Sequence, residues 1–401
     1  MSKAEQMQLP VSELQIGITV KLPMSWKNHP FLLNRVEIKD ATQIELIKSL
    51  GVPYVILLAG QELIEQQREQ QVETVEAKTE EEPQVDPKAV VRKSLRLSQQ
   101  RFIDCVNDSR SSFSKVASDP EGAYRTAAAV VEQMLEHMFE VDKPFLALVS
   151  AGESDASVTQ HGISVAVLSL MIAKALDMPK SIMRDITLGC LFHDIGKLKV
   201  PDVIRRKKTG LTPQEANFMK MHPNFGYDML NKSGLYPKQM LDIVLHHHEF
   251  IDGSGYPDGL TEAKISTSTQ IVSLANDFDK QLWSGEISSP QIALGYLFKN
   301  RAGKHTEKLI EVLVKILGIY PPGTLVELSN GCVGKVMMTG KEVRQPQVWA
   351  CEADGSEASL RFLSQEGVTV TRVVKLEELT EGALKVLQAD TGICFYFSSM
   401  E

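Results

Sequence analysis

Apolar and polar positions alternate in different ways along three parts of the chain. Residues 146–319 contain runs with helical spacing separated by Gly and Pro, which predicts an all-α domain. The expected helices cover 163–176, 181–191, 213–220 and 240–246. After residue 319 the spacing changes to short β-prone runs, so residues 320–401 are expected to form a β-rich carboxy-terminal extension. Those runs cover 325–328, 333–338, 347–351 and 368–374.

The residues before the predicted all-α domain divide into three segments. Residues 1–60 are typical of a small α/β domain, with a strand expected over 11–20, a helix over 41–50 that Gly51 ends, and a buried strand over 52–58. Residues 61–96 are rich in Glu and Gln and are interpreted as an acidic linker. Residues 97–145 are predicted to be an amphipathic helical segment. Its apolar stripe favours either core packing or the seam of a homodimer, and consists of Ala127, Val130, Val131, Met134, Leu135 and Met138.

Composition narrows the class of protein. The 401 residues are 43% hydrophobic and 23% charged, as in soluble proteins of two or three domains. A net charge of −8 argues against a nucleic-acid polymer as partner. Five cysteines without a CxxC pair favour a reducing compartment. With a polar amino terminus and no apolar run near the ~20 residues that span a bilayer, a cytoplasmic location with no membrane contact is expected.

Histidine is concentrated in one part of the chain. Six of the nine histidines lie between positions 161 and 248. One is in the motif His193-Asp194-Ile195-Gly196-Lys197, two begin a His247–Pro257 string that reads HHEFIDGSGYP, and His246 directly precedes that string. The other two, His161 and His222, lie near expected helix ends. Neighbouring residues on a helix point ~100° apart, so His193 and Asp194 suit two cations better than one. Imidazole and carboxylate without clustered thiolates favour iron or manganese over structural zinc. Isolated His29, His137 and His305, and His246 as the first of three, are interpreted as structural.

These motifs together resemble an HD-GYP domain, a branch of the HD phosphohydrolase superfamily, over roughly 155–320. The amino-terminal region is similar to the uncharacterised domain that precedes some bacterial HD-GYP domains. That second similarity rests on Leu9–Leu14, Trp26 and His29-Pro30-Phe31. The resemblance implies a phosphodiesterase that opens cyclic di-GMP to linear pGpG and in some members further to GMP, while other members prefer cyclic GMP-AMP.

The resemblance also implies roles for single residues. Two divalent ions, iron or manganese, would be held by His161, His193, Asp194, His222, His247 and His248, with Asp194 bridging. Such ions lower the pKa of a bridging water and so yield a hydroxide nucleophile. Asp194 and Lys197 are the expected catalytic side chains, with Lys197 stabilising charge or protonating the leaving oxygen. Tyr256 and Asp279 are expected to contact substrate, the tyrosine through its ring or its hydroxyl, and Glu249 and Asp252 to support the ligands and the loop. A plain helix cap with a buried tyrosine is the alternative for this loop.

The chain departs from the family pattern at the last ligand. The family has Ala-Asp-x-x-Asp-Ala where this chain reads Ala275-Asn276-Asp277-Phe278-Asp279-Lys280. Asn276 takes the ligand position, and Asp277 is a carboxylate one residue too late. Replacing a charged ligand with a neutral one should weaken the binding of at least one cation. It should also leave the occupied site more positive toward a phosphate group. Ser157 replaces a Glu that supports a third metal in some members. Residues 283–290 lack the basic segment that often holds phosphate. Lys280, Arg301 and Lys304 are candidate substitutes, and solvated surface side chains are the default interpretation of them.

Three functions follow from these observations. The leading hypothesis is a metal-dependent phosphodiesterase for cyclic di-GMP or a related cyclic dinucleotide. The second is a degenerate HD-GYP protein that acts through protein contacts, for example with diguanylate cyclases, and Asn276 motivates it. The third is an HD phosphohydrolase for another nucleotide.

Overall fold

The computed structural model of this chain describes residues 7–23, 34–50, 52–64, 86–150, 158–207, 210–282, 289–342 and 344–399. The chain forms two compact units, Met1–Gln84 and Val85–Glu401, and each is described by itself. Three segments used in the comparison with the family pattern lie outside the described residues. These are Trp26 with the His29–Phe31 segment, Ser157, and most of 283–290.

The first unit is a small α/β domain, as predicted. Its four antiparallel strands have the order β1-β4-β2-β3 and are β1 (Gln8–Pro10), β2 (Thr19–Lys21), β3 (Arg35–Glu37) and β4 (Tyr54–Ala59). Helix α1 (Ala41–Ser49) begins at Asp40, whose side chain accepts the Gln43 amide, and its Ile47 is buried in the core beside the sheet residues. The expected strand over 11–20 is wrong for most of its length, because Val11–Glu13 forms a single 3-10 turn.

The second unit begins with a pair of packed helices, α3 (Pro87–Lys115) and α4 (Pro120–Phe139). Residues 87–96, placed in the expected linker, are helical, because Pro87 occupies the first turn and the Asp86 side chain caps it. The apolar stripe of α4 is buried in the main core of its own chain. That burial accounts for the stripe without a partner chain.

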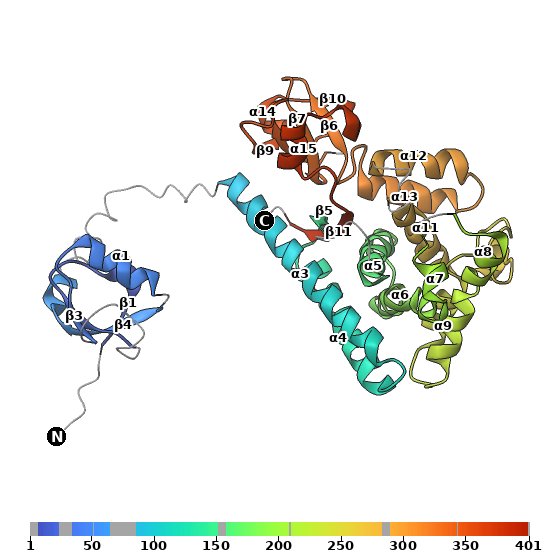
Figure 1. Cartoon of the computed structure of the whole chain (residues 1–401), viewed down its shortest axis with the longest axis horizontal. Coiled ribbons are helices and arrows are strands. Elements are labelled where there is room, and N and C mark those ends of the chain that lie inside the picture. Colours follow the sequence, from blue (N-terminus) through green and yellow to red (C-terminus); the bar gives the residue numbers. More distant parts are fainter. Residues whose placement is uncertain are drawn as a thin grey trace. The chain divides into compact units, whose positions relative to one another are not determined.

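The helical part of the second unit confirms the predicted all-α domain. Its longer helices are α5 (Val158–Ala175), α6 (Lys180–Phe192), α8 (Pro213–Met219), α9 (His222–Asn231), α10 (Lys238–His246), α11 (Thr267–Leu282), α12 (Pro290–Asn300) and α13 (Glu307–Leu317). Helix α5 packs against α6, α11 and α13 at the centre of this group (Figure 1). Among the described helices, α5 is long and apolar enough to cross a membrane by length and composition alone, but 83% of that stretch is buried inside the protein. Such burial is typical of a core helix.

The carboxy-terminal part is β-rich, as predicted. Its strands are β6 (Leu325–Leu328), β7 (Val333–Met338), β8 (Gln347–Cys351), β9 (Ser359–Phe362) and β10 (Val370–Val373). The sequence pattern did not predict β9, nor the two further strands that complete the sheet. The last strand, β11 (Ile393–Ser398), pairs along its whole length with β5 (Phe145–Ser150). Figure 1 shows this pair between α3 and α5, so the carboxy-terminal end of the chain is part of the core that supports the helical domain.

Candidate metal centre

The metal-ligand candidates are brought together by the ends of several helices. Helix α6 ends at Phe192, and His193 and Asp194 follow it directly. His161 lies in the first turn of α5, and His247 follows α10. His222 was expected before a helix end, but it is the first residue of α9, because Pro223 lacks an amide hydrogen and is tolerated in a first turn. Helix ends thus point these side chains toward one buried space.

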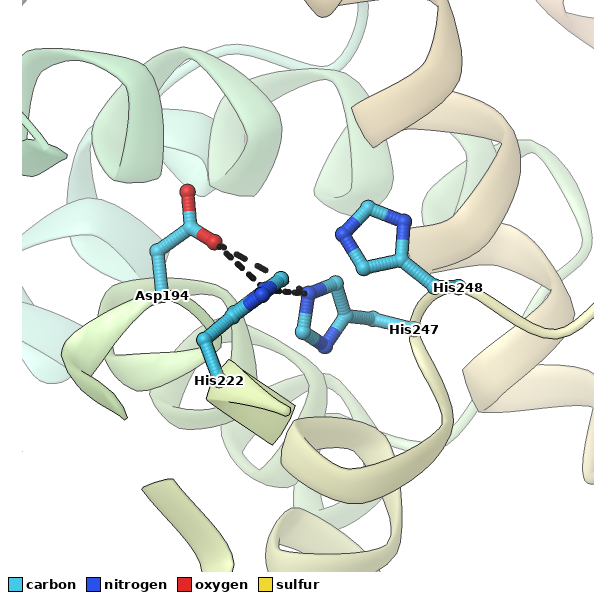
Figure 2. Close-up of side chains that lie close together, drawn as sticks. All are labelled: Asp194, His222, His247 and His248. Atoms are coloured by element: carbon cyan, nitrogen blue, oxygen red, sulfur yellow. Dashed lines mark hydrogen bonds and ion pairs between the residues drawn. The ribbon is translucent and has the colours of Figure 1, made fainter. Parts of the chain in front are cut away.

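One group of donors surrounds the Oδ1 atom of Asp194. The Nε2 atom of His222 lies 3.1 Å from this oxygen and 3.2 Å from Nε2 of His247. His247 Nε2 is 3.9 Å from the same oxygen. Figure 2 shows these three side chains together with His248, and one donor atom from each of the four lies within 4.8 Å of the others. We refer to Asp194, His222, His247 and His248 as the four-ligand group.

A second group surrounds the other carboxylate oxygen of Asp194. His193 Nε2 lies 3.4 Å and His161 Nε2 3.7 Å from Oδ2. The Asn276 side-chain oxygen lies 3.0 Å from His161 Nε2. We refer to His161, His193 and Asp194 as the three-ligand group. Asp194 belongs to both groups and presents one oxygen to each, which is the arrangement of a carboxylate that bridges two cations.

Four of the histidine rings are oriented from behind by a hydrogen bond at Nδ1. The Nδ1 atoms of His193, His222 and His247 donate to backbone carbonyls three residues earlier, at Cys190 (2.7 Å), Met219 (2.8 Å) and Val244 (2.8 Å). Those carbonyls belong to the last turns of α6, α8 and α10, which have no partner within their own helices. His161 Nδ1 donates instead to the Asp279 carboxylate at 2.6 Å. In each ring, a proton on Nδ1 leaves the Nε2 lone pair directed into the shared space.

The donors fit a divalent cation. His193 and His248 are buried, and their Nε2 atoms form no hydrogen bond with any described residue. A buried polar atom without a partner is costly, and a cation supplies the missing partner. The set combines imidazole with carboxylate, and no described cysteine thiol joins either group.

Electrostatics keep the ligands in the form that binds a cation. Burial is the main cause that lowers the pKa of His193, His222, His247 and His248. For His247 the neighbouring His193 and His222 rings add to this effect, and its pKa lies well below the ordinary value. These rings are therefore neutral at pH 7. Burial alone would raise the pKa of Asp194, but the neighbouring Lys197 ammonium holds the pKa of that carboxyl well below its usual value.

The geometry distinguishes Asn276 from Asp277. Asn276 faces His161, as the alignment without a gap predicts. Asp277 points elsewhere, since its carboxylate accepts from Arg301 Nε at 2.8 Å and lies 3.0 Å from His305 Nε2. His305, interpreted from the sequence as structural, is buried and takes part in this network.

Asp279 was expected to contact substrate, but the structure gives it another position. Its side chain is completely buried behind His161 and does not line the cavity above the histidines. A carboxylate that accepts the Nδ1 proton fixes the ring orientation and makes Nε2 more basic. We therefore assign Asp279 to the orientation of His161.

The two acidic residues of the loop have different surroundings. Glu249 is buried and accepts the backbone amides of Asp258, Gly259 and Leu260, so it holds the loop closed. Asp252 is exposed and caps only its own turn at the Ser254 amide. Thus Glu249 supports the loop as expected, whereas Asp252 contacts none of the ligand histidines.

Glycine is required where two backbone segments meet beneath the ligands. A β-carbon on Gly196 would lie 1.9 Å from the His222 carbonyl oxygen, and one on Gly255 would lie 2.4 Å from the Glu249 α-carbon. Neither position has room for a side chain. The glycines of the two motifs therefore allow the His193 and His222 segments, and the loop and its histidines, to approach closely.

A cavity of about 590 Å³ opens above the ligands, within the range of small-molecule sites. Asp194, Lys197, Tyr256 and Asn276 are among the residues that line it. Lys197 Nζ donates to Asp194 Oδ2 at 2.6 Å. The Tyr256 ring stacks on His248 with ring centroids 4.6 Å apart, so one of its faces is already covered. Its hydroxyl is then the better candidate for a contact with phosphate.

Comparison with known proteins identifies two families along the chain. Residues 132–306 match the model described as an HD domain, and residues 6–127 match a domain of unknown function, DUF3391. A cyclic di-GMP phosphodiesterase of Pseudomonas aeruginosa is 31% identical over 231 residues, which cover 55% of this chain and 54% of that protein. The cyclic di-GMP phosphodiesterase response regulator RpfG of Xanthomonas campestris is 34% identical over 149 residues, 36% of this chain and 39% of that protein.

A 3′3′-cGAMP-specific phosphodiesterase of Vibrio cholerae is 34% identical over 133 residues, 31% of this chain and 24% of that protein. The matched segments thus span about half or less of the length of these curated relatives. Residues 132–306 of this chain therefore form a domain of the HD family, and a DUF3391 domain lies on its amino-terminal side. Within that family, the resemblance to HD-GYP proteins is confirmed, and its relatives there include cyclic-dinucleotide phosphodiesterases.

Proposed function

We propose that this protein is a metal-dependent phosphodiesterase that hydrolyses cyclic di-GMP, or a related cyclic dinucleotide, to the linear dinucleotide. The observation that carries this proposal is the pair of ligand groups that share Asp194 at the base of an open cavity. The names of the relatives support the substrate class. The buried donors support two divalent ions, with iron or manganese favoured by the ligand types.

The ligands assign a chemical task to the centre. Bound divalent cations would supply Lewis-acid activation of water and would neutralise the charge of the phosphodiester. Asp194 would hold both cations with its two oxygens, and the four histidine rings that donate through Nδ1 would keep their Nε2 lone pairs in place. The chain thereby provides a preorganised anionic and imidazole shell that needs no rearrangement at the moment of reaction.

Two further side chains act on the substrate itself. Lys197 is held in place by its 2.6 Å contact with Asp194, and its remaining hydrogens can be donated to a phosphoryl oxygen or to the leaving 3′-oxygen. Tyr256 places a hydroxyl in the same cavity, and the stack on His248 limits its rotation. Both residues would bind the phosphodiester and orient it toward the cations.

Turnover of two cyclic dinucleotides tests this function. Protein purified from iron- or manganese-rich medium is incubated with cyclic di-GMP and with cyclic GMP-AMP, and metal per chain is measured on the same sample. We expect linear products from wild-type protein, loss of activity in His193→Ala, and wild-type activity in His137→Gln, which removes a histidine on α4 away from the centre. A protein that holds its metal and leaves both substrates intact would refute the proposal.

Asn276 favours one alternative, a signalling protein that has lost turnover and acts through contacts with partners such as diguanylate cyclases. A neutral amide in place of a carboxylate weakens a cation site, and activity could be lost in this way. Metal content separates the two functions. Less than one ion per chain under iron-rich expression, together with unchanged cyclic dinucleotides, would favour the alternative.

A further inference from the structure

Three cationic side chains line the cavity above the ligands, and two of them are neutralised by a carboxylate. Lys197 pairs with Asp194 at 2.6 Å, and Arg301 pairs with Asp277 at 2.8 Å. The third is Lys280. Among the residues that the structure describes, none forms a hydrogen bond or an ion pair with the Lys280 ammonium. The cavity wall therefore carries one positive charge that the protein leaves available.

Helix α11 fixes the position of this charge. Lys280 follows Asn276 by four residues, so the two side chains lie on the same face of the helix, one turn apart. Both line the cavity. Lys280 thus lies on the side of the centre where Asn276 contributes no charge, and its field reaches His248, whose pKa it helps to lower after the effect of burial.

The charge of Lys280 faces water in the cavity and stands near other cations. Lys280 is exposed where it lines the cavity. Partial loss of hydration there, and then the charge of Lys197, lower the pKa of Lys280 to about 8. An anionic ligand in the cavity would supply the partner that this ammonium lacks among the described residues.

We propose that Lys280 is a substrate-binding residue that donates to a non-bridging oxygen of the phosphodiester on the Asn276 side of the centre. The inference rests on the proposed function for the identity of the substrate, and on the cavity geometry for the chemistry of the ligand, a phosphate oxygen. Arg301 differs from Lys280, because Asp277 holds its guanidinium against the wall, 5.6 Å from the centre of the Phe250 ring. Among the described cations that line the cavity, Lys280 is therefore the one without a carboxylate partner, and a phosphate oxygen can take that place.

Binding of inorganic phosphate to manganese-loaded protein tests this role without requiring turnover. Isothermal titration compares wild-type protein with Lys280→Met, Lys280→Arg and Lys299→Met, the last removing an exposed lysine at the end of α12. A charge-assisted hydrogen bond of ordinary strength predicts roughly tenfold weaker phosphate binding in Lys280→Met. We expect Lys280→Arg to retain most of the affinity and Lys299→Met to remain within about twofold of wild type.

Metal content is measured on every variant, so that an effect on the phosphate is distinguished from an effect on the centre. The inference is overturned if Lys280→Met binds phosphate as wild type does, if its metal content falls together with its affinity, or if wild-type protein binds no phosphate. A second outcome separates the two proposals. If Lys280→Met loses phosphate affinity while the wild-type protein opens neither cyclic dinucleotide, the proposed substrate is refuted and this inference stands. Where turnover is present, the KM of Lys280→Met should rise and its kcat should change less.

Discussion

The two sides of Asp194 offer unequal ligand sets. On the Oδ1 side, three histidines complete the four-ligand group. On the Oδ2 side, His161 and His193 are joined only by the neutral amide of Asn276. A carboxylate attracts a cation through its full charge, whereas an amide oxygen attracts it through a dipole. An amide can also present its N–H to the His161 Nε2 lone pair, which an ionised carboxylate cannot do.

This difference shows that a shared carboxylate does not make two cation sites equal. Both sites take the same charge from Asp194, so their relative affinity depends on the remaining ligands. We therefore expect one tight ion at the four-ligand group and one weaker ion beside Asn276. The Lys280 charge, one helical turn from Asn276 on the same face of α11, favours an anionic substrate in the cavity.

Removing the shared ligand should abolish both sides. Asp194→Ala is expected to lose most of its bound metal and to reduce turnover of a cyclic dinucleotide by at least about 10³-fold, because both cation sites lose their only negative charge. Metal per chain and initial rates measure the two effects. Asp228→Ala on exposed α9 serves as the control and should behave as wild type. Two ions retained in Asp194→Ala would contradict a bridging role.

Removing one ligand from each side should give different results. His161→Ala is expected to retain one tightly bound ion, whereas His247→Ala should retain only the weaker ion, because it opens the four-ligand group. Titration with manganese under a competing chelator measures the affinity that remains in each variant. Equal affinities, or the reverse order, would show that the two sides are not ranked as their ligands imply.

Restoring a carboxylate should reduce the difference between the sides. Asn276→Asp is expected to raise the affinity for the more weakly bound ion by roughly tenfold, or about 1.4 kcal/mol, because it adds a charged ligand next to His161. The same titration measures it. Asn231→Asp at the exposed end of α9 adds the same charge away from the centre and should leave both affinities unchanged. If the affinity for the second ion is unchanged in Asn276→Asp, Asn276 is not a ligand of that ion.

Acid should affect both sides of the metal-free protein in the same direction. The pKa values of His193, His222, His247 and His248 are lowered, first of all by burial, so these rings stay neutral in the folded state while their unfolded counterparts protonate near pH 6.5. Their contribution is therefore complete above about pH 6.5 and is lost as the pH falls, by about 1.4 kcal/mol per pH unit for each ring that remains neutral. Urea unfolding at several pH values in the presence of a chelator measures this slope. A flat profile between pH 6.5 and 5 would contradict buried neutral rings.

The accuracy of the sequence predictions varies with the kind of contact that forms each element. The expected helices over 163–176 and 240–246 differ from α5 and α10 by a few residues, because a local 3.6-residue period defines them. The strands β6, β7 and β8 were also predicted to the residue. The β5–β11 pair was not predicted, because each strand gains its partner from almost 250 residues away.

The candidate site shows the same division. The clustered histidines and aspartate indicated a metal centre, and the unbroken alignment placed Asn276 rather than Asp277 beside His161. The position of a residue in the sequence did not reveal its role where the orientation of the side chain decides that role. Asp279 lies behind His161, and Asp252 caps its own turn in solvent. The backbone carbonyls that orient His193, His222 and His247 have no sequence signature, because every residue has a carbonyl.

The sequence by itself determined the family, the helical domain and the residue types that can hold a cation, because these depend on local periodicity and on side-chain chemistry. Tertiary structure alone decided which oxygen of Asp194 faces which histidines, which carboxylate supports a ring and which cation remains without a partner. Those properties depend on directions and distances between helix ends far apart in the chain. Lys280 is the clearest case. The sequence could not separate it from Arg301 and Lys304, whereas in the structure Arg301 pairs with Asp277 and no described residue pairs with the Lys280 ammonium.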